Sequence, residues 1–167
     1  AAMEDPNPLV SGFGIRRLRE AGITAEIAPE FSAEAAELDE AYVHFMRKGL
    51  PLVILKAAVT LDGKISAPED NEGWITSETA RAHVQQLRHR TDAILTGIGT
   101  VLADDCRLTD RTGLERSRPL LRIVVDSQLR IPLSSRMVAE ARSDLLVVTT
   151  SAASSERRRN LENRGVE

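Results

Sequence analysis

Apolar residues in the first 50 positions are spaced mainly as in helices. Helical spacing predicts a helix over 15–21 and a longer one that begins at Ser32, whose hydroxyl is the expected N-cap. Between them, strict alternation over 23–27 predicts a half-buried strand. Gly49 should end the longer helix, and Pro51 prevents it from resuming. We therefore expect one domain over residues 1–49 and a second over 50–167.

Beyond residue 50, apolar runs alternate with helical segments. Strands are predicted over 52–59, 93–96, 120–125 and 145–150, with helices from about Ser77 and over 154–163. A turn is expected at Asp62-Gly63, and a loop over 97–100. This alternation predicts an α/β fold with a parallel sheet. Val166 and Glu167 stand where a further strand should begin, so we also expect the chain to be truncated.

Composition narrows the possible partners. The net charge of −3 gives no reason to expect nucleic acid, and aromatic residues, at 3%, are too few for a platform that stacks bases. The apolar stretches are too short to span a membrane. Cys106 is the only cysteine, which excludes an internal disulfide and a zinc site built from paired cysteines. We expect a cytoplasmic protein without a metal site of its own.

Three segments of the second domain, taken in their order and spacing, resemble a known family. They are Leu55–Ala58 with Leu61–Ile65, then Trp74–Ser77, then Gly97–Asp105 with Leu108-Thr109 and Arg111 close behind. They are similar to the start of the reductase domain of bifunctional riboflavin-biosynthesis deaminase/reductases, and Val125–Ser127 continues the match. Upstream, Asp5–Gly12 with Gly14-Ile15 resembles the tail of the deaminase domain in the same family.

The resemblance implies a fold and a reaction. The fold would be like that of dihydrofolate reductase, a mostly parallel sheet with helices on both faces, preceded by a short α/β tail of a deaminase domain. The enzyme would use NADPH to reduce the ribosyl group of 5-amino-6-(5-phosphoribosylamino)uracil to the ribityl compound. The parent protein is expected to be a homo-oligomer, with zinc only in its deaminase part.

The resemblance also implies roles for single residues. The cofactor contacts would be Ala58, Trp74, Thr100, Asp104 and Ser127. The substrate contacts would be Glu72, Arg88, Leu108 and Arg111, where paired arginines suit a sugar phosphate. Asp104 and Lys56 are the candidate catalytic residues; Lys56 interrupts an apolar run, where a lysine is costly unless it is paired, functional or able to reach solvent.

The chain departs from the family pattern in several places. Glu72 replaces a serine that touches substrate, and a carboxylate would repel a phosphate. Cys106 stands where a proline is common. The late glycine-rich loop and the zinc signature of the deaminase are missing, so we expect neither deamination nor useful turnover from these 167 residues alone.

Two other functions stay open. The chain could be a dihydrofolate-reductase relative with another pterin or pyrimidine substrate, or a catalytically silent fragment that binds or dimerises. Each motif by itself also has a structural explanation: Gly97–Gly99 as a plain turn, Trp74 as a packing residue, and the arginines near residue 88 as a solvated helix face.

We predict that the chain binds no stoichiometric zinc, because it has one cysteine and no His-x-Glu motif. Metal analysis of the purified protein should find far less than one zinc per chain. About one tightly held zinc per chain would contradict this.

Overall fold

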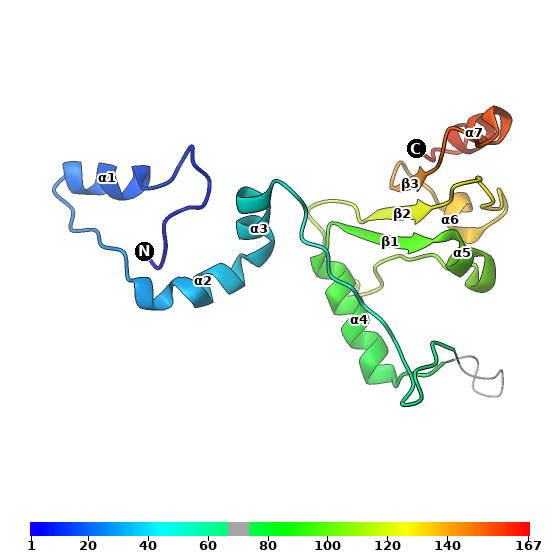
Figure 1. Cartoon of the computed structure of the whole chain (residues 1–167), viewed down its shortest axis with the longest axis horizontal. Helices are drawn as coiled ribbons and strands as arrows, with labels where there is room; N and C mark the ends of the chain where they lie inside the picture. Colours follow the sequence, from blue (N-terminus) through cyan, green and yellow to red (C-terminus); the bar gives the residue numbers. More distant parts are fainter. Residues whose placement is uncertain (67–73) are drawn as a thin grey trace. The chain divides into compact units, whose positions relative to one another are not determined.

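The computed structural model describes residues 1–66 and 74–167 (Figure 1). Within these ranges the chain forms two compact units, Ala1–Ala57 and Ala58–Glu167. The division falls within the apolar segment 52–59, and each unit has its own set of contacts.

The first unit contains short helices only. They are α1 (Phe13–Glu20), the 3-10 turn η1 (Pro29–Phe31), α2 (Ser32–Leu38) and α3 (Glu40–Lys48). Hydrogen bonds tie the N-terminus to this unit: the N–H of Ala28 donates to the carbonyl of Ala1 over 2.8 Å, and the Tyr42 hydroxyl donates to Asp5 over 2.7 Å. The helix predicted over 15–21 is confirmed by α1.

Other expectations for this unit were wrong. Residues 23–27 form no strand, because the described part of the first unit offers no strand with which they could pair. The predicted long helix breaks at Asp39, whose dihedral angles leave the helical region (φ −111°, ψ 30°). Ser32 does not cap it, since its hydroxyl donates to the carbonyl of Ala2. Gly49 ends α3 as predicted, in the left-handed conformation (φ 68°).

The second unit is built on a parallel sheet in the order β1 (Ala93–Gly97), β2 (Leu121–Val125) and β3 (Leu145–Val148). Strand register aligns Gly97 with Val125, and Val125 with Val148. Val166 forms a parallel bridge with Leu145, so the chain begins to pair again beside β3. The predicted α/β class with a parallel sheet is confirmed, as is the expected start of pairing at Val166.

Four helices of this unit follow or precede the strands: α4 (Glu78–Arg90), α5 (Ile98–Asp104), α6 (Arg136–Ala139) and α7 (Ser155–Glu162). Serine caps start three of them; for α4, the hydroxyl of Ser77 accepts the N–H of Ala80 over 3.2 Å. The helices predicted from Ser77 and over 154–163 are confirmed. The predicted loop over 97–100 is instead the N-cap and first turn of α5, because the chain turns into the helix directly after β1.

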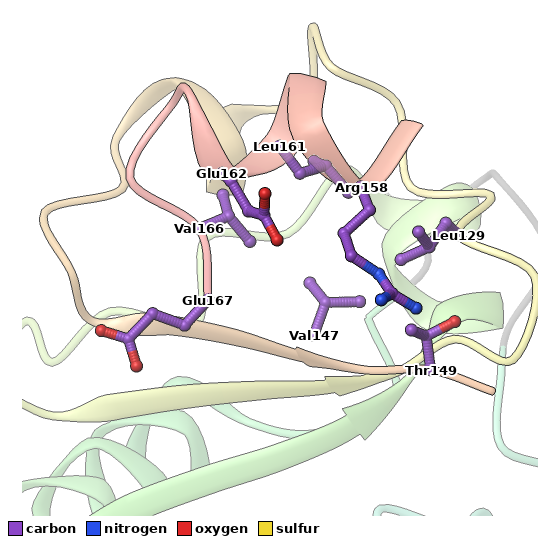
Figure 2. Close-up of a pocket in the computed structure, with 8 residues that line it drawn as sticks. All are labelled: Leu129, Val147, Thr149, Arg158, Leu161, Glu162, Val166 and Glu167. Carbon is purple, nitrogen blue, oxygen red and sulfur yellow. The ribbon is translucent and has the colours of Figure 1, made fainter. Parts of the chain in front are cut away.

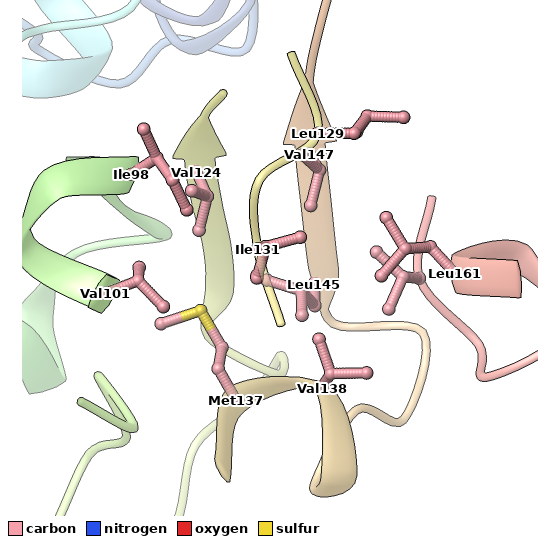
Figure 3. Packing of buried hydrophobic residues seen from close by; sticks show 11 residues of the cluster. Ile98, Val101, Val124, Leu129, Ile131, Met137, Val138, Leu145, Val147 and Leu161 are labelled. Carbon is pink, nitrogen blue, oxygen red and sulfur yellow. The ribbon is translucent and has the colours of Figure 1, made fainter. Parts of the chain in front are cut away.

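Apolar side chains from α5, α6 and α7 pack on one face of the sheet (Figure 3). This core is formed by Ile98, Val101, Val124, Leu129, Ile131, Met137, Val138, Leu145, Val147, Leu161 and Val166. Leu95, Val125 and Val148, on the opposite face, are 64%, 42% and 47% exposed. The described residues therefore bury one side of the sheet and leave apolar side chains of the other side in solvent.

The strand predicted over 52–59 is absent. Leu55 is 92% exposed, and the segment pairs with none of the three described strands. An apolar run favours burial in a sheet, but a strand forms only where a partner strand accepts its hydrogen bonds.

A buried ion pair links the sheet to the loop before β3. The Arg122 side chain, on β2, is 1% exposed and donates to Asp144 over 2.8 Å. Burial by itself would raise the pKa of Asp144, but hydrogen bonds from Arg122 and from the Arg142 N–H outweigh it and lower that pKa. The carboxylate therefore stays ionised beside a cation that cannot reach water.

We predict that Asp144→Ala lowers the free energy of unfolding by about 3 kcal/mol at neutral pH, because it leaves the Arg122 charge buried and unpaired. The folded-state pKa of Asp144 is lowered, so the stabilisation is complete above the unfolded pKa of about 4 and is lost as the pH falls through the folded pKa. Urea unfolding at several pH values should show wild type and variant converging in acid.

Glu140→Gln is the matched control, because Glu140 pairs with Arg107 at the surface, where the two side chains are 41% and 50% exposed. Its effect should stay below about 1 kcal/mol. Equal losses in the two variants would show that burial of Arg122 does not matter.

Candidate functional site

Three of the expected cofactor residues follow the carboxyl ends of adjacent strands. Thr100 and Asp104 lie on α5, directly after β1, and both are exposed. Ser127 is exposed just beyond β2, and its carbonyl accepts hydrogen bonds from the hydroxyls of Thr149 and Thr150, just beyond β3. Parallel α/β sheets bind ligands at this edge. The sheet thus brings residues that are far apart in sequence to one edge.

Two glycines leave open space at the same edge. A Cβ atom built at Gly97 or at Gly99 would meet no other described atom within 4 Å. Gly97 has a φ of −84°, which any residue can adopt, so its backbone conformation does not require glycine. Room beside the backbone is what a closely approaching cofactor needs.

Arg88 and Arg111, the two expected phosphate ligands, lie close together. Arg88 is half-buried near the end of α4 and donates to the carbonyl of Thr109 over 2.7 Å. Burial lowers the pKa of Arg88, and the positive charge of Arg111 lowers it further. The Nε atom of Arg88 is buried and has no hydrogen-bond partner among the described residues. The guanidinium of Arg111 is exposed and has neither a hydrogen bond nor an ion pair within 1–66 and 74–167.

The loop that carries Leu108 has unusual backbone geometry. Asp105 and Leu108 have φ values of 40° and 53°, a region that costs a residue with a Cβ atom about 1–2 kcal/mol. Such strain persists only where the surroundings hold the backbone, and it is concentrated at functional sites. Leu108 is half-buried and packs at the border of the core.

Cys106 lies near both an expected cofactor residue, Asp104, and an expected substrate residue, Arg88. Burial raises the pKa of its thiol, the negative charge of Asp104 adds to this, and the positive charge of Arg88 opposes it. The thiol therefore lies near both the expected cofactor residue and the expected substrate residue.

Four expected site residues remain: Ala58, Trp74, Lys56 and Glu72. Trp74 is 51% exposed, and the Arg81 guanidinium lies 4.7 Å from its ring centroid. Ala58, at the start of the second unit, is half-buried. Lys56 is exposed and belongs to the first unit. Glu72 lies outside the described residues.

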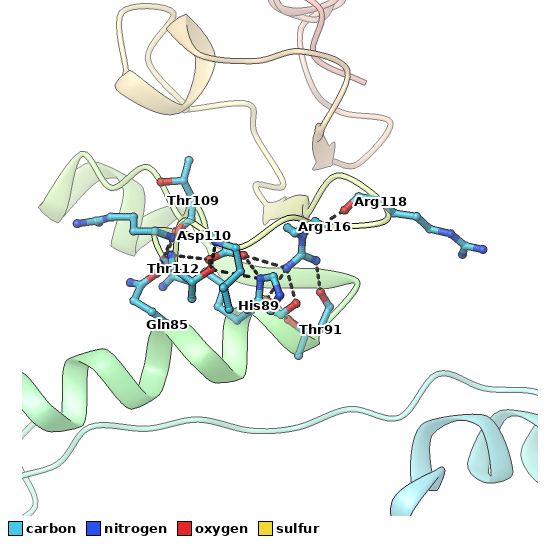
Figure 4. Close-up of polar contacts among 11 residues, drawn as sticks. Gln85, His89, Thr91, Thr109, Asp110, Thr112, Arg116 and Arg118 are labelled. Atoms are coloured by element: carbon cyan, nitrogen blue, oxygen red, sulfur yellow. Dashed lines mark hydrogen bonds and ion pairs between the residues drawn. The ribbon is translucent and has the colours of Figure 1, made fainter.

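A polar cluster beside Arg88 and Arg111 was missed in the sequence (Figure 4). The Nδ1 atom of His89 lies 2.6 Å from a carboxylate oxygen of Asp110, and Arg116 lies 3.3 Å from the same oxygen. His89 was assigned no role from the sequence. Its partner is 21 residues away, so no local spacing could have revealed the pair.

A hollow lies elsewhere, between β3, α7 and the last residues (Figure 2). Its lining contains none of the expected site residues and consists of Leu129, Val147, Thr149, Arg158, Leu161, Glu162, Val166 and Glu167. Across the described ranges, no cluster of three metal-ligating side chains occurs. No helix in those ranges is long and apolar enough to cross a membrane.

Comparisons with known proteins identify relatives of this chain. The riboflavin biosynthesis protein RibD of Bacillus amyloliquefaciens is 39% identical over 166 residues, which cover 99% of this chain and 44% of that protein. RibD of Escherichia coli is 40% identical over 151 residues, covering 84% of this chain and 41% of that protein. The chain therefore spans less than half the length of these relatives.

Solved structures show the same similarity. Acinetobacter baumannii RibD superimposes with a TM-score of 0.82 at 35% identity, covering 99% of this chain and 45% of that one. A Thermotoga maritima diaminohydroxyphosphoribosylaminopyrimidine deaminase/5-amino-6-(5-phosphoribosylamino)uracil reductase gives a TM-score of 0.76 at 30% identity, covering 99% and 51%. The family model described as the RibD C-terminal domain matches residues 51–167. With most of its length matched in this way, the chain belongs to the RibD C-terminal domain family.

Proposed function

We propose that this chain forms part of an NADPH-dependent reductase that converts 5-amino-6-(5-phosphoribosylamino)uracil to the ribityl product in riboflavin biosynthesis. Family membership supports the reaction class. The observation that carries the substrate class is the arginine pair: Arg88 has a buried, unpartnered Nε atom beside the free guanidinium of Arg111. Two such cations repel each other until an anion lies between them, and a phosphate monoester fits that need.

In this proposal each group of residues has a separate task. Arg88 and Arg111 bind the substrate's phosphate and so fix the position of its sugar. Ala58, Trp74, Thr100, Asp104 and Ser127 contact the cofactor, whose hydride reduces C1′ of the sugar. The reaction also consumes a proton, and Asp104 and Lys56 are the side chains proposed to carry it. Glu72 stays a predicted substrate contact.

The choice of NADPH as the hydride donor rests on the resemblance to the family. The open space beside Gly97 and Gly99, and the exposed side chains of Thr100 and Ser127, fit a nucleotide at the carboxyl edge of the sheet.

For residues 1–49 we propose an origin in the C-terminal part of a deaminase domain. The alignment with the Bacillus protein covers 99% of this chain, and so extends well upstream of residue 51. Zinc would belong to the rest of that deaminase domain. The homo-oligomeric state and the cytoplasmic location stay predictions.

The direct test is whether the full-length natural protein oxidises NADPH. The reaction is followed by absorbance at about 340 nm, where only the reduced cofactor absorbs. Oxidation should require the phosphoribosylamino-pyrimidine, and the dephosphorylated substrate should be a poor replacement. Oxidation that is equally fast with dihydrofolate, or with no pyrimidine, would contradict the proposal.

We predict that Arg88→Ala and Arg111→Ala each weaken substrate binding by roughly ten- to a hundred-fold, equivalent to about 1.5–3 kcal/mol for a charge-assisted hydrogen bond. The affinity for NADPH should change much less. Arg90→Ala is the control, because Arg90 is an exposed cation on the same helix. Normal affinity of either variant for the phosphorylated substrate would remove that arginine from the site.

Substitution of Gly99 should raise the free energy of unfolding and lower the affinity for NADPH. Gly99→Ala should raise the free energy of unfolding by up to about 1 kcal/mol, because Gly99 lies within α5 and a Cβ atom there meets nothing within 4 Å. The same methyl group should lower NADPH affinity about tenfold by keeping the cofactor from the backbone. Gly14→Ala in α1, which also has open space, should change stability alone.

A further inference from the structure

The arginine pair needs a device that holds it in place. Arg88 is partly desolvated and close to the charge of Arg111. Repulsion between like charges would drive the exposed Arg111 away from Arg88 in the absence of a ligand. Whatever fixes the loop that carries Arg111 therefore determines whether both cations are available to one anion.

Successive residues of that loop are bonded to α4. The carbonyl of Thr109 accepts from Arg88 over 2.7 Å, and the N–H of Arg111 donates to the Gln85 side chain over 3.1 Å. Asp110 lies between these two anchors and contacts His89 over 2.6 Å. The backbone on both sides of Asp110 is thus attached to α4, the helix that carries Arg88. Figure 4 shows Asp110 beside His89 of that helix.

Asp110 makes four polar contacts, which involve both oxygens of its carboxylate. One of its oxygens accepts from the N–H and the hydroxyl of Thr112, over 2.9 and 2.8 Å. The other contacts His89 and Arg116. Burial would raise the pKa of Asp110, but these hydrogen bonds outweigh it and hold the pKa well below its ordinary value. The side chain, only 9% exposed, is a permanent anion at neutral pH.

Arg116 completes the attachment at the end of the helix. Its guanidinium donates to the carbonyls of His89 and Thr91, each over 2.6 Å, and to that of Arg88 over 3.1 Å. The last carbonyls of a helix lack the usual partners within the helix, so a cation satisfies them well. The Arg88 carbonyl also accepts from the N–H and the hydroxyl of Thr91. Arg116 also balances the charge of Asp110, which keeps the carboxylate from opposing an anion bound by Arg111.

We propose that Asp110 is a positioning residue for the phosphate site: through His89, Thr112 and Arg116 it fixes the 109–112 loop on α4 and keeps Arg111 beside Arg88. The inference rests on the proposed function, because it assigns the arginine pair to a phosphate monoester. Asp110 itself does not touch the ligand.

The test follows the Nε–H signals of Arg88 and Arg111 by NMR in this chain, with ribose 5-phosphate as the probe and ribose as the control without a phosphate. In the wild type, ribose 5-phosphate should shift both signals and ribose should shift neither. Asp110→Ala should weaken ribose 5-phosphate binding about tenfold and increase the ligand-free mobility of the Arg111 side chain, because pre-organisation is lost.

Asp110→Asn provides a second variant, since it keeps an oxygen that can accept from Thr112 and removes the charge that pairs with His89 and Arg116. We expect it to bind ribose 5-phosphate more weakly than the wild type and more tightly than the alanine variant. If Asp110→Ala does not fold, the asparagine variant decides alone. Asp92→Ala, at an exposed carboxylate of the same unit, should leave the affinity and both arginine signals unchanged.

The outcomes separate the two hypotheses. If the wild-type chain does not bind ribose 5-phosphate, the phosphate site is wrong, and so is the proposed substrate class. A wild-type chain that binds it, beside folded Asp110 variants with unchanged affinity and unchanged Arg111 mobility, leaves the phosphate site intact and overturns the role of Asp110.

Discussion

Parallel hydrogen bonding between β1, β2 and β3 aligns Gly97, Val125 and Val148 in one row at the carboxyl edge of the sheet. Because each strand leaves the sheet at this edge, the chain must turn there three times, and each turn presents polar groups to solvent. The first turn leads into α5 with Thr100 and Asp104, and the second exposes Ser127. The proposed cofactor contacts therefore depend on the register of the sheet more than on any local motif.

The charges and hydrogen bonds around each arginine distinguish those that stabilise the fold from those available to a ligand. Arg122 is buried and Arg116 is half-buried, and each has an aspartate beside it and backbone carbonyls around it. Arg88 is half-buried beside a second cation, Arg111, and the charge of Asp110 offsets only part of that repulsion. Its Nε atom is buried and unpartnered among the described residues, as is that of Arg122, so the neighbouring cation is what sets Arg88 apart. A protein tolerates such a pair of cations where a ligand supplies further negative charge.

Hydrogen bonds from several elements fix the loop between α5 and β2. These contacts keep residues of the loop in the left-handed backbone conformation. Arg122 donates to the carbonyl of Arg107, Arg88 donates to that of Thr109, and the N–H of Arg136 donates to Asp105. These contacts come from β2, α4 and α6. Strained backbone persists where its surroundings over-determine it, and here that rigidity places Leu108 and Arg111 next to the end of α4.

Local pattern predicted α4, α7 and all three strands of the second unit, and short motifs indicated the family, but α5 and α6 were not predicted. It failed over 52–59 and 23–27, because an apolar or alternating segment becomes a strand only when another strand accepts its hydrogen bonds. It also could not pair His89 with Asp110, or Arg122 with Asp144, because side chains 21 and 22 residues apart meet only after the sheet has formed. The sequence alone thus determined which residue types were available for chemistry, and the tertiary structure decided which charges are compensated and which are left for a ligand.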